Sequence, residues 1–215
     1  NNDRFIGGIA MLPMNNISAA VQIIEDIPHN SRLVGAQIFT RALGKSIADE
    51  QFHKIFKAAN ENKVPLLLHP VFDNRKPDNN IVFSWEYEIS QAMMQIVQAD
   101  IFVQFPNLKI IVHHAGGMIP FFAERINHIL PPEQSQAFQR FYVDTALLGN
   151  PKAIELAISY FGVEHVLFGT DAPLGIAPAG ATGEIIKAIR EANLTSEQQT
   201  MIFSDNFNRL FIKEK

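Results

Sequence analysis

Short apolar runs alternate with longer amphipathic stretches along nearly the whole chain. The runs are rich in β-branched residues and apolar on successive positions, which is typical of strands buried on both faces of a parallel sheet. They occupy residues 5–12, 33–39, 64–68, 109–112, 141–143 and 165–168. The sequence therefore predicts six buried strands joined by right-handed helical connections.

Helical periodicity fills most of the intervals between these runs. Capping residues precede two of the periodic stretches, namely Asn15 or Asn16 and Asp49, and a third stretch starts at Asn150-Pro151. The pattern predicts helices at residues 16–27, 50–62, 84–105, 120–130, 150–160, 182–192, 196–203 and 205–212. Three stretches rich in polar residues, glycine or proline are predicted to be loops, at residues 71–80, 131–136 and 169–180.

The spacing of the strands distinguishes two parallel architectures. They begin at intervals of roughly 32 residues, close to the roughly 30 residues per unit of an eightfold barrel of about 250 residues. A doubly wound sheet is the alternative, but its glycine fingerprint would follow the first strand, whereas Gly7 and Gly8 lie inside that strand. We therefore predict an α/β fold, a (β/α)8 TIM barrel with about six of its eight units present, forming one domain over residues 1–215.

Composition narrows the class of protein. Hydrophobic residues make up 47% of the chain and charged residues 19%, which excludes disordered and coiled-coil proteins. The net charge of −4 supplies no basic surface for nucleic acid. No apolar run has the length of a membrane span, and the first residues lack the features of a signal peptide. We therefore expect a cytoplasmic protein without nucleic acid or membrane partners.

Three of the six strands end in residues that can bind a metal or transfer a proton. They are His69, the pair His113 and His114, and Asp171. In a barrel the carboxyl ends of the strands meet on one face, where active sites lie. The absence of cysteine leaves His, Asp and Glu as metal ligands, and two imidazoles with a carboxylate suit Zn²⁺ or a similar divalent ion. Alternatively, one histidine of the pair is packed in the core.

Other polar and aromatic residues are candidates for the wall of a pocket. Gly116 and Gly117 allow a tight turn after the histidines, and Pro120 suits the first turn of the next helix. Arg125 and His128 share a helix face, so they either meet a substrate carboxylate or form a solvated surface. Further candidates, each with an exposed-loop or core-packing alternative, are Thr40, Arg41, Asp144, Phe72, Trp85, Phe121 and Phe122.

Several motifs in this order resemble a known family. They include Val-Pro-Leu-Leu-Leu-His-Pro at 64–70, His-Ala-Gly-Gly-Met-Ile-Pro-Phe at 114–121 followed by Arg125, and Val-Leu-Phe-Gly-Thr-Asp-Ala-Pro at 166–173. Shorter matches lie at residues 3–5, 11–13, 35–38, 105–109 and 142–144. The sequence is similar to the amidohydrolase-related family of metal-dependent barrel enzymes, which includes aminocarboxymuconate semialdehyde decarboxylase and resorcylate-type decarboxylases. This resemblance also implies a homodimer.

The resemblance implies a role for individual residues. His69 corresponds to the metal-binding histidine after the fifth barrel strand, His114 to the catalytic histidine after the sixth, and Asp171 to the metal-binding aspartate after the eighth. Asp171 is also expected to take part in catalysis. Arg125, Trp85 and Phe72 are expected to contact the substrate. The fourth barrel strand ends in Phe39 and Thr40, without the lysine of a two-metal site. One divalent metal is therefore expected, with zinc favoured and manganese the alternative.

One family feature is missing from the sequence. Family members begin with a strand that ends in His-x-His, and these 215 residues contain no such motif. By alignment, Asn1 falls just before the third barrel strand. We therefore expect the native polypeptide to extend upstream by roughly 60 to 80 residues.

The expected activity is nonoxidative decarboxylation of a small aromatic or unsaturated carboxylic acid. His114 titrates near neutral pH and can exchange the proton, while the metal orients the substrate. Hydrolysis or hydration at the same site, such as opening of a lactone or cleavage of a C–N bond, is the first alternative. The second alternative is a non-catalytic barrel remnant with a binding role.

Overall fold

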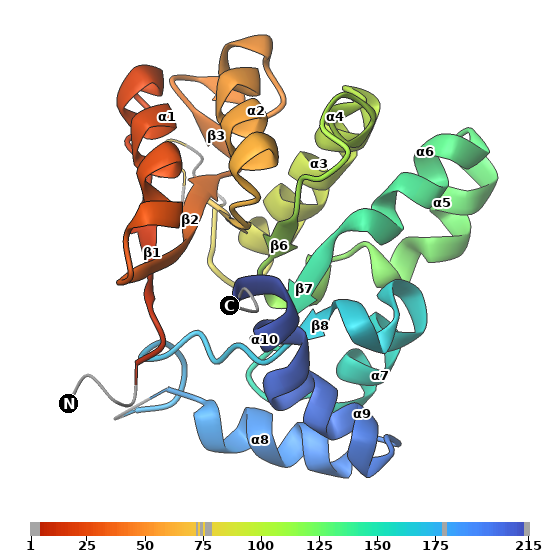
Figure 1. Cartoon of the computed structure of the whole chain (residues 1–215). Coiled ribbons are helices and arrows are strands. Elements are labelled where there is room, and N and C mark those ends of the chain that lie inside the picture. The colour runs from red at the N-terminus through yellow and green to blue at the C-terminus, as the bar shows by residue number, and fades with distance from the viewer. Residues whose placement is uncertain (1–4, 72, 74, 76–78, 178–179, 213–215) are drawn as a thin grey trace. The chain divides into compact units, whose positions relative to one another are not determined.

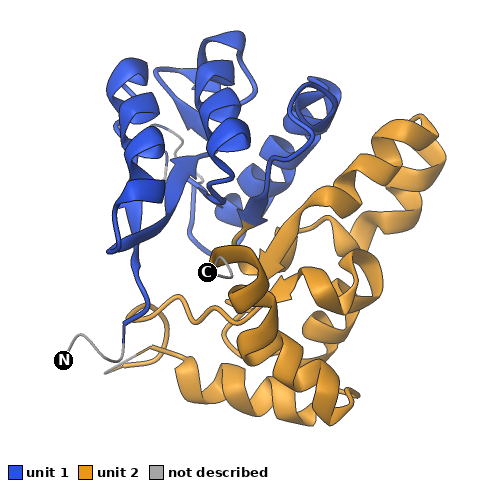
Figure 2. Ribbon diagram, in the orientation of Figure 1, with its two compact units in different colours: residues 1–111 blue, residues 112–215 orange. Residues whose placement is uncertain are grey.

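The computed structural model describes residues 5–71, 73, 75, 79–177 and 180–212. The chain divides into two compact units, Asn1–Ile111 and Val112–Lys215, which we call unit 1 and unit 2 (Figure 2). Each unit contains its own parallel strands and its own helices (Figure 1). Among the described residues, none of the helices combines the length and apolarity that crossing a lipid bilayer requires.

Parallel strands form the centre of unit 1. β2 (Leu33–Phe39) pairs with β1 (Gly8–Met11) on one side and with β5 (Leu66–His69) on the other. The register places Phe39 opposite His69, so the last residues of β2 and β5 are neighbours. The predicted strands at 33–39 and 64–68 are therefore confirmed, the second with a shift of its bounds.

The helices of unit 1 follow the predicted order. They are α1 (Ile17–Asp26), the short turns η2 (Ile27–His29) and η3 (Glu50–Phe52), α2 (His53–Asn62), α3 (Ser84–Gln98) and α4 (Ile101–Gln104) (Figure 1). Asn16 caps α1 by accepting the Ala19 N–H at 3.1 Å, as predicted. The single helix expected over 84–105 is wrong, because Asp100 has a left-handed φ of 52° that ends one helix and begins another.

A small hairpin in unit 1 was not predicted. β3 (Arg41–Ala42) and β4 (Lys45–Ser46) pair antiparallel through a two-residue turn. Leu43 and Gly44 have φ of 54° and 76°, as a type I′ turn requires. The hairpin therefore begins directly after the end of β2, where Thr40 and Arg41 were candidate pocket residues.

Unit 2 repeats the alternation of strand and helix. β6 (Ile110–Val112) lies where the chain passes between the units, and β7 (Tyr142–Asp144) pairs parallel with β8 (Val166–Leu167). In unit 1 the strand order is β1-β2-β5, and in unit 2 β7 lies beside β8. The helices are α5 (Ala123–Ile129), α6 (Pro132–Ala137), α7 (Pro151–Phe161), α8 (Thr182–Glu191), α9 (Ser196–Thr200) and α10 (Asn206–Phe211), with short turns η4 (His114–Gly116), η5 (Pro120–Phe122), η6 (Phe138–Arg140), η7 (Val163–His165) and η8 (Met201–Asp205).

The first residues of two helices in unit 2 agree with the predicted helix starts in one case and not in the other. α7 starts after Asn150 as predicted, and the Asn150 side chain caps it by accepting the N–H groups of Lys152 and Ala153. The loop expected at 131–136 is wrong, since Pro132 opens α6 as its first residue. Proline is well suited to that position because it has no N–H to leave unpaired.

Each unit buries its own apolar side chains. Phe52, Ile55 and Phe56 are fully buried in unit 1, and Phe138 and Phe141 are fully buried in unit 2. Burying one such side chain contributes about 1.5–3 kcal/mol relative to leaving it exposed. The strand ends that carry the candidate residues are therefore held by packed elements rather than by loops alone.

Candidate active site

His69 ends β5 in unit 1, and its ring orientation is fixed by three neighbours. Its Nδ1 lies 2.7 Å from the Pro70 carbonyl oxygen. The ring packs edge-on against Trp85 at 5.7 Å and against Phe39 at 6.2 Å between centroids. Because a carbonyl oxygen only accepts, Nδ1 carries the hydrogen and Nε2 carries the lone pair of the neutral ring.

This arrangement fits a metal-binding histidine. Such histidines commonly donate the second ring N–H to a backbone carbonyl, which fixes the tautomer and the ring direction. Trp85, predicted to contact substrate, is half-buried in the first turn of α3 (Ser84–Gln98) and contacts the imidazole of His69. Phe72 lies outside the described residues.

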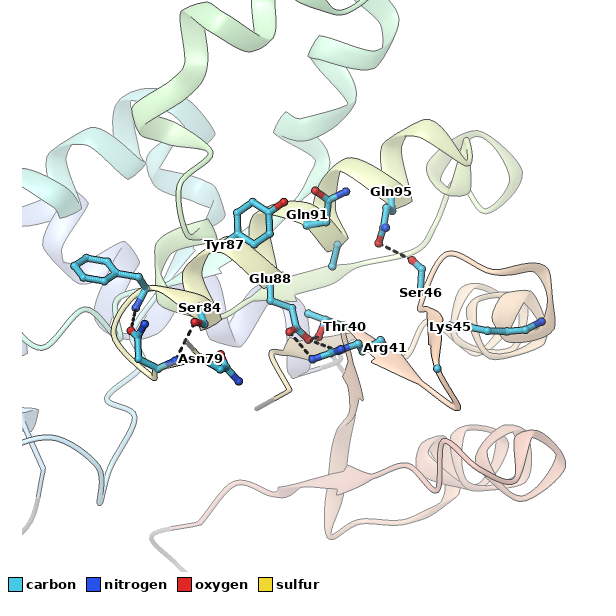
Figure 3. Close-up of a pocket in the computed structure, with 14 residues that line it drawn as sticks. Thr40, Arg41, Lys45, Ser46, Asn79, Ser84, Tyr87, Glu88, Gln91 and Gln95 are labelled. Atoms are coloured by element: carbon cyan, nitrogen blue, oxygen red, sulfur yellow. Dashed lines mark hydrogen bonds and ion pairs between the residues drawn. The ribbon is translucent and has the colours of Figure 1, made fainter. Parts of the chain in front are cut away.

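A network of carboxylates and an arginine surrounds the loop after β5. Glu88 on α3 accepts hydrogen bonds from the Thr40 hydroxyl and from Arg41 Nε at 3.1 Å (Figure 3). It also accepts the Val71 N–H at 3.2 Å. Its second oxygen lies 3.0 Å from Arg41 Nη2, and Arg41 Nη1 lies 2.9 Å from Asp73. Arg41 is therefore committed to two carboxylates, and Glu88 and Asp73 are residues that the sequence analysis missed.

The charges in this network stabilise one another. Hydrogen bonds from Arg75 and Arg41 hold the pKa of Asp73 well below its ordinary value. Burial by itself lowers the pKa of Arg41, but the hydrogen bonds to Asp73 and Glu88 outweigh burial and raise the pKa. An open cavity of about 530 Å³ adjoins the network and is lined by residues that include Thr40, Lys45, Tyr87, Gln91 and Gln95 (Figure 3).

In unit 2 the chain turns sharply after β6. His114, Ala115, Gly116 and Gly117 all have positive φ, at 56°, 53°, 77° and 61°. Positive φ costs a non-glycine residue roughly 1–2 kcal/mol, and residues held in this way are concentrated at functional sites. A Cβ at Gly116 would lie 2.9 Å from the ring of Phe161, so glycine is needed there for space as well as for conformation.

Asp144 holds this turn from the end of β7. Its Oδ1 accepts the His114 N–H at 2.8 Å and the Ala146 N–H at 3.0 Å, and its Oδ2 lies 2.7 Å from His113 Nδ1. Burial by itself raises the pKa of Asp144, but the His113 hydrogen bond and the nearby imidazoles outweigh burial and lower the pKa. A Cβ at Gly169 would lie 2.8 Å from the Cβ of Asp144, so this glycine allows β8 and β7 to end close together.

His114 and Asp171, the two predicted catalytic residues, come together in unit 2. His114 Nε2 lies 4.0 Å from Asp171 Oδ2, and the side chains are 7% and 24% exposed. Asp171 also has a positive φ of 54°. The distance is too long for a direct hydrogen bond, so the imidazole and the carboxylate face one another with both groups able to act on a third species.

The predicted metal ligands belong to different units, His69 to unit 1 and Asp171 to unit 2. Within the part of the chain that the structure describes, no group of three or more His, Asp and Glu side chains is close enough to hold a metal ion. The surroundings of each residue still suit a ligand, because a backbone carbonyl holds His69 through Nδ1 and Asp171 has a partly exposed carboxylate.

The other predicted pocket residues of unit 2 are mostly exposed. Arg125 lies on the exposed side of α5, and His128 on the same helix lies 3.6 Å from Glu124, with about 80% of each side chain exposed. Phe121 is 76% exposed and does not pack in a core. The solvated-face alternative therefore describes His128, while the expected substrate contact of Arg125 stays a prediction.

Comparison with known proteins identifies the family. The Amidohydrolase family model matches residues 1–212. The chain belongs to the amidohydrolase family. It is 25% identical to a 2-amino-3-carboxymuconate-6-semialdehyde decarboxylase of Dictyostelium discoideum, covering 94% of this chain and 60% of that protein. It is 26% identical to a 6-methylsalicylic acid decarboxylase of Penicillium expansum, covering 97% and 69%.

Solved structures show the same fold for this amidohydrolase. A 5-carboxyvanillate decarboxylase of Sphingomonas paucimobilis is 23% identical with a TM-score of 0.85, covering 95% of this chain and 66% of that one. A dihydroxybenzoic acid decarboxylase of Polaromonas, solved with bound manganese, is 20% identical with a TM-score of 0.83, covering 95% and 68%. The predicted class of fold is confirmed, and the chain spans 60% and 69% of the two curated relatives.

Proposed function

We propose that this protein is a metal-dependent lyase that removes the carboxyl group of a small aromatic or unsaturated carboxylic acid as CO₂ without oxidation. The observation that carries the proposal is the approach of His114 to Asp171, 4.0 Å apart at the ends of β6 and β8. The names of the relatives supply the reaction class, since both curated relatives above are decarboxylases.

His69 and Asp171 are the proposed ligands of one divalent metal ion. Such an ion, when bound, orients the substrate carboxylate or a neighbouring hydroxyl and stabilises negative charge on it. Zinc was the expectation from the sequence. The manganese in the Polaromonas structure makes manganese an equal candidate for this protein. Metal analysis of the natural protein distinguishes them.

His114 is the proposed proton donor. When the carbon–carbon bond to the carboxyl group breaks, its electron pair stays on the substrate carbon and CO₂ leaves. That carbon then takes a proton from the imidazolium of His114. General acid catalysis of this kind typically contributes a rate factor of roughly 10²–10⁴. Asp144 holds the backbone of His114, and Asp171 faces its ring. Arg125, Trp85 and Phe72 are the proposed substrate contacts.

The test is release of CO₂ from a panel of hydroxybenzoates and carboxymuconate-like acids, with metal content measured on the same samples. His69→Ala and Asp171→Ala should each lower both metal occupancy and turnover, because each removes a ligand that no neighbour replaces. Glu61→Gln on α2 is the control, since Glu61 pairs only loosely with Lys57 at 3.7 Å on an exposed surface. Full metal occupancy in either alanine variant would remove that residue from the proposed site.

Hydration is the second candidate function. A 2-keto-4-carboxy-3-hexenedioate hydratase of a Sphingobium strain is 22% identical and covers 95% of this chain and 65% of that protein. On this alternative His114 acts as a base toward water rather than as an acid toward carbon. Loss of the substrate double bond without CO₂ release would favour hydration. The homodimer, the cytoplasmic location and the absence of nucleic acid and membrane partners stay predictions.

A further inference from the structure

We propose that Glu88 is a positioning residue for His69 and that it acts across the single peptide group between Pro70 and Val71. The inference rests on the proposed function, because it concerns His69 as a metal ligand. It adds Glu88 on α3, 17 positions after Val71 in sequence, to the residues that shape the metal site.

The peptide group is the physical connection. Its carbonyl oxygen, on Pro70, lies 2.7 Å from His69 Nδ1, and its N–H, on Val71, donates to Glu88 Oε1 at 3.2 Å. A peptide group is planar and rigid, so fixing its N–H also fixes the direction of its carbonyl. Glu88 therefore sets the position of the acceptor that holds the imidazole of His69.

The charge of Glu88 has an electronic consequence as well. A hydrogen bond from the peptide N–H to a carboxylate polarises the peptide and makes its carbonyl a stronger acceptor. A stronger acceptor on Nδ1–H makes Nε2 a more basic ligand, which is the effect of the carboxylate partners found behind many metal-binding histidines. Here the carboxylate reaches the histidine through a peptide instead of touching it.

Glu88 is itself held firmly enough to serve this role. Thr40, which follows β2, and Arg41, the first residue of β3, donate to its two oxygens (Figure 3). The side chain of Glu88 is only 16% exposed. Trp85 lies three residues earlier on α3 and packs against the His69 ring. Residues three apart share a helix face, so α3 contributes both the anchor of the peptide and the wall beside the imidazole.

Metal affinity without turnover is the direct test. The natural protein is freed of metal and titrated with Mn²⁺ alone, while free Mn²⁺ is counted by electron paramagnetic resonance. Glu88→Gln keeps the size of the side chain and removes its charge, and it should weaken binding by roughly tenfold to a hundredfold. Glu61→Gln, which neutralises an exposed carboxylate on α2, should bind as the wild type does.

A double-variant cycle separates positioning from general structural support. Because Glu88 acts through His69, adding Glu88→Gln to His69→Ala should not weaken Mn²⁺ binding further, whereas independent effects would add. Wild-type affinity in His69→Ala would overturn the proposed metal site. Weak binding in His69→Ala together with wild-type affinity in Glu88→Gln, or losses that add, would overturn the present inference alone.

A milder variant covers the case in which Glu88→Gln does not fold. Thr40→Val removes one hydrogen-bond donor to the Glu88 carboxylate and leaves the charges of Glu88 and Arg41 unchanged. It should weaken Mn²⁺ binding severalfold in the wild-type background and not at all with His69→Ala. Unchanged affinity in the folded Thr40→Val protein, or an equal loss in both backgrounds, would count against the role of Glu88.

Discussion

Two carboxylates, Glu88 in unit 1 and Asp144 in unit 2, hold strand-end histidines in different ways. Glu88 is held mainly by the guanidinium of Arg41 and reaches His69 through a peptide group. Asp144 accepts two backbone N–H groups and lies 2.7 Å from the imidazole of His113. The carboxylate of Glu88 is bound mainly by one charged side chain, whereas the carboxylate of Asp144 is bound by two backbone N–H groups together with a histidine ring.

The difference affects what each network can tolerate. Arg41 keeps its charge at every accessible pH, lies 24% exposed, and also contacts Asp73, so losing one partner leaves it another partner and water. Asp144 is 6% exposed, and its partners have few alternatives if it is removed. Unpaired polar groups are costly in such surroundings. We therefore expect unit 2 to be the more sensitive to substitution.

The largest effect should come from His114, the residue that Asp144 positions. His114→Asn removes the titrating ring but leaves its backbone N–H to bond Asp144, so the fold should survive. Turnover should fall by roughly hundredfold to ten-thousandfold, the contribution of a general acid. CO₂ release measures it, and circular dichroism checks the fold.

His113→Asn is the matched control for that prediction. His113 bonds Asp144 through Nδ1, and its predicted role is not proton transfer. It should lower turnover much less than His114→Asn. A larger loss in His113→Asn would mean that the neighbouring histidine carries the proton.

The second largest effect should be on folding stability. Asp144→Ala leaves the His114 N–H, the Ala146 N–H and the His113 ring without their acceptor, and should lower the free energy of unfolding by about 3–5 kcal/mol. Glu88→Ala leaves Arg41 bound to Asp73 and partly hydrated, and should cost about 1–3 kcal/mol. Urea denaturation measures both. Equal losses would contradict the contrast between the two networks.

The sequence predicted the candidate residues at strand ends better than the residues that hold them in place. His69, His114 and Asp171 each lie within three residues of the end of a continuous apolar run, so the local pattern locates them without any knowledge of tertiary contacts. Two of them, His114 and Asp171, do face each other. The third belongs to the other unit, and its expected role in metal binding stays a prediction.

Glu88 and Asp73 gave no such signal. The contact of Glu88 with Arg41 joins residues 47 positions apart, and on α3 Glu88 resembles any polar residue of an amphipathic helix. A local sequence pattern does not encode which helix face meets a given loop. The hairpin that was not predicted did have a local signal, because Gly44 is typical of a tight turn. Leu43 before it has a positive φ, which leucine rarely adopts, so the pair is not typical of such a turn.

The third largest effect should come from two glycines, Gly116 in unit 2 and Gly44 in unit 1. Gly116→Ala in unit 2 adds a Cβ 2.9 Å from Phe161 at a φ of 77°, so strain and overpacking combine to cost about 2–4 kcal/mol. Gly44→Ala in unit 1 has a similar φ of 76° but no atom within 4 Å of the new Cβ, so strain alone should cost about 1–2 kcal/mol. Thermal unfolding distinguishes them, and a smaller loss for Gly116→Ala would be inconsistent with the packing around the histidine turn.

The smallest effect should be the dependence of stability on pH and salt through Asp73. Arg75 and Arg41 lower the pKa of Asp73 from the ordinary 3.8, so the folded state favours the ionised carboxylate. The resulting stability is present above the ordinary pKa and is lost as the pH falls through the lower pKa of the folded state. The gap in unfolding free energy between wild type and Asp73→Asn should therefore stay constant from pH 7 to roughly pH 5 and shrink below roughly pH 4.

High salt should weaken the stabilising contribution of Asp73 but not that of Asp144. The Arg75 side chain is 76% exposed, so about 1 M sodium chloride should screen its attraction to Asp73 and narrow the Asp73→Asn gap at neutral pH. The corresponding gap for Asp144→Asn should not narrow, because Asp144 is buried and its backbone partners are not screened. Denaturation in low and high salt measures both variants side by side. A gap for Asp144→Asn that narrows as much as that for Asp73→Asn would mean that exposed charges, rather than the buried contacts of Asp144 with two backbone N–H groups and the His113 ring, hold the histidine turn of unit 2.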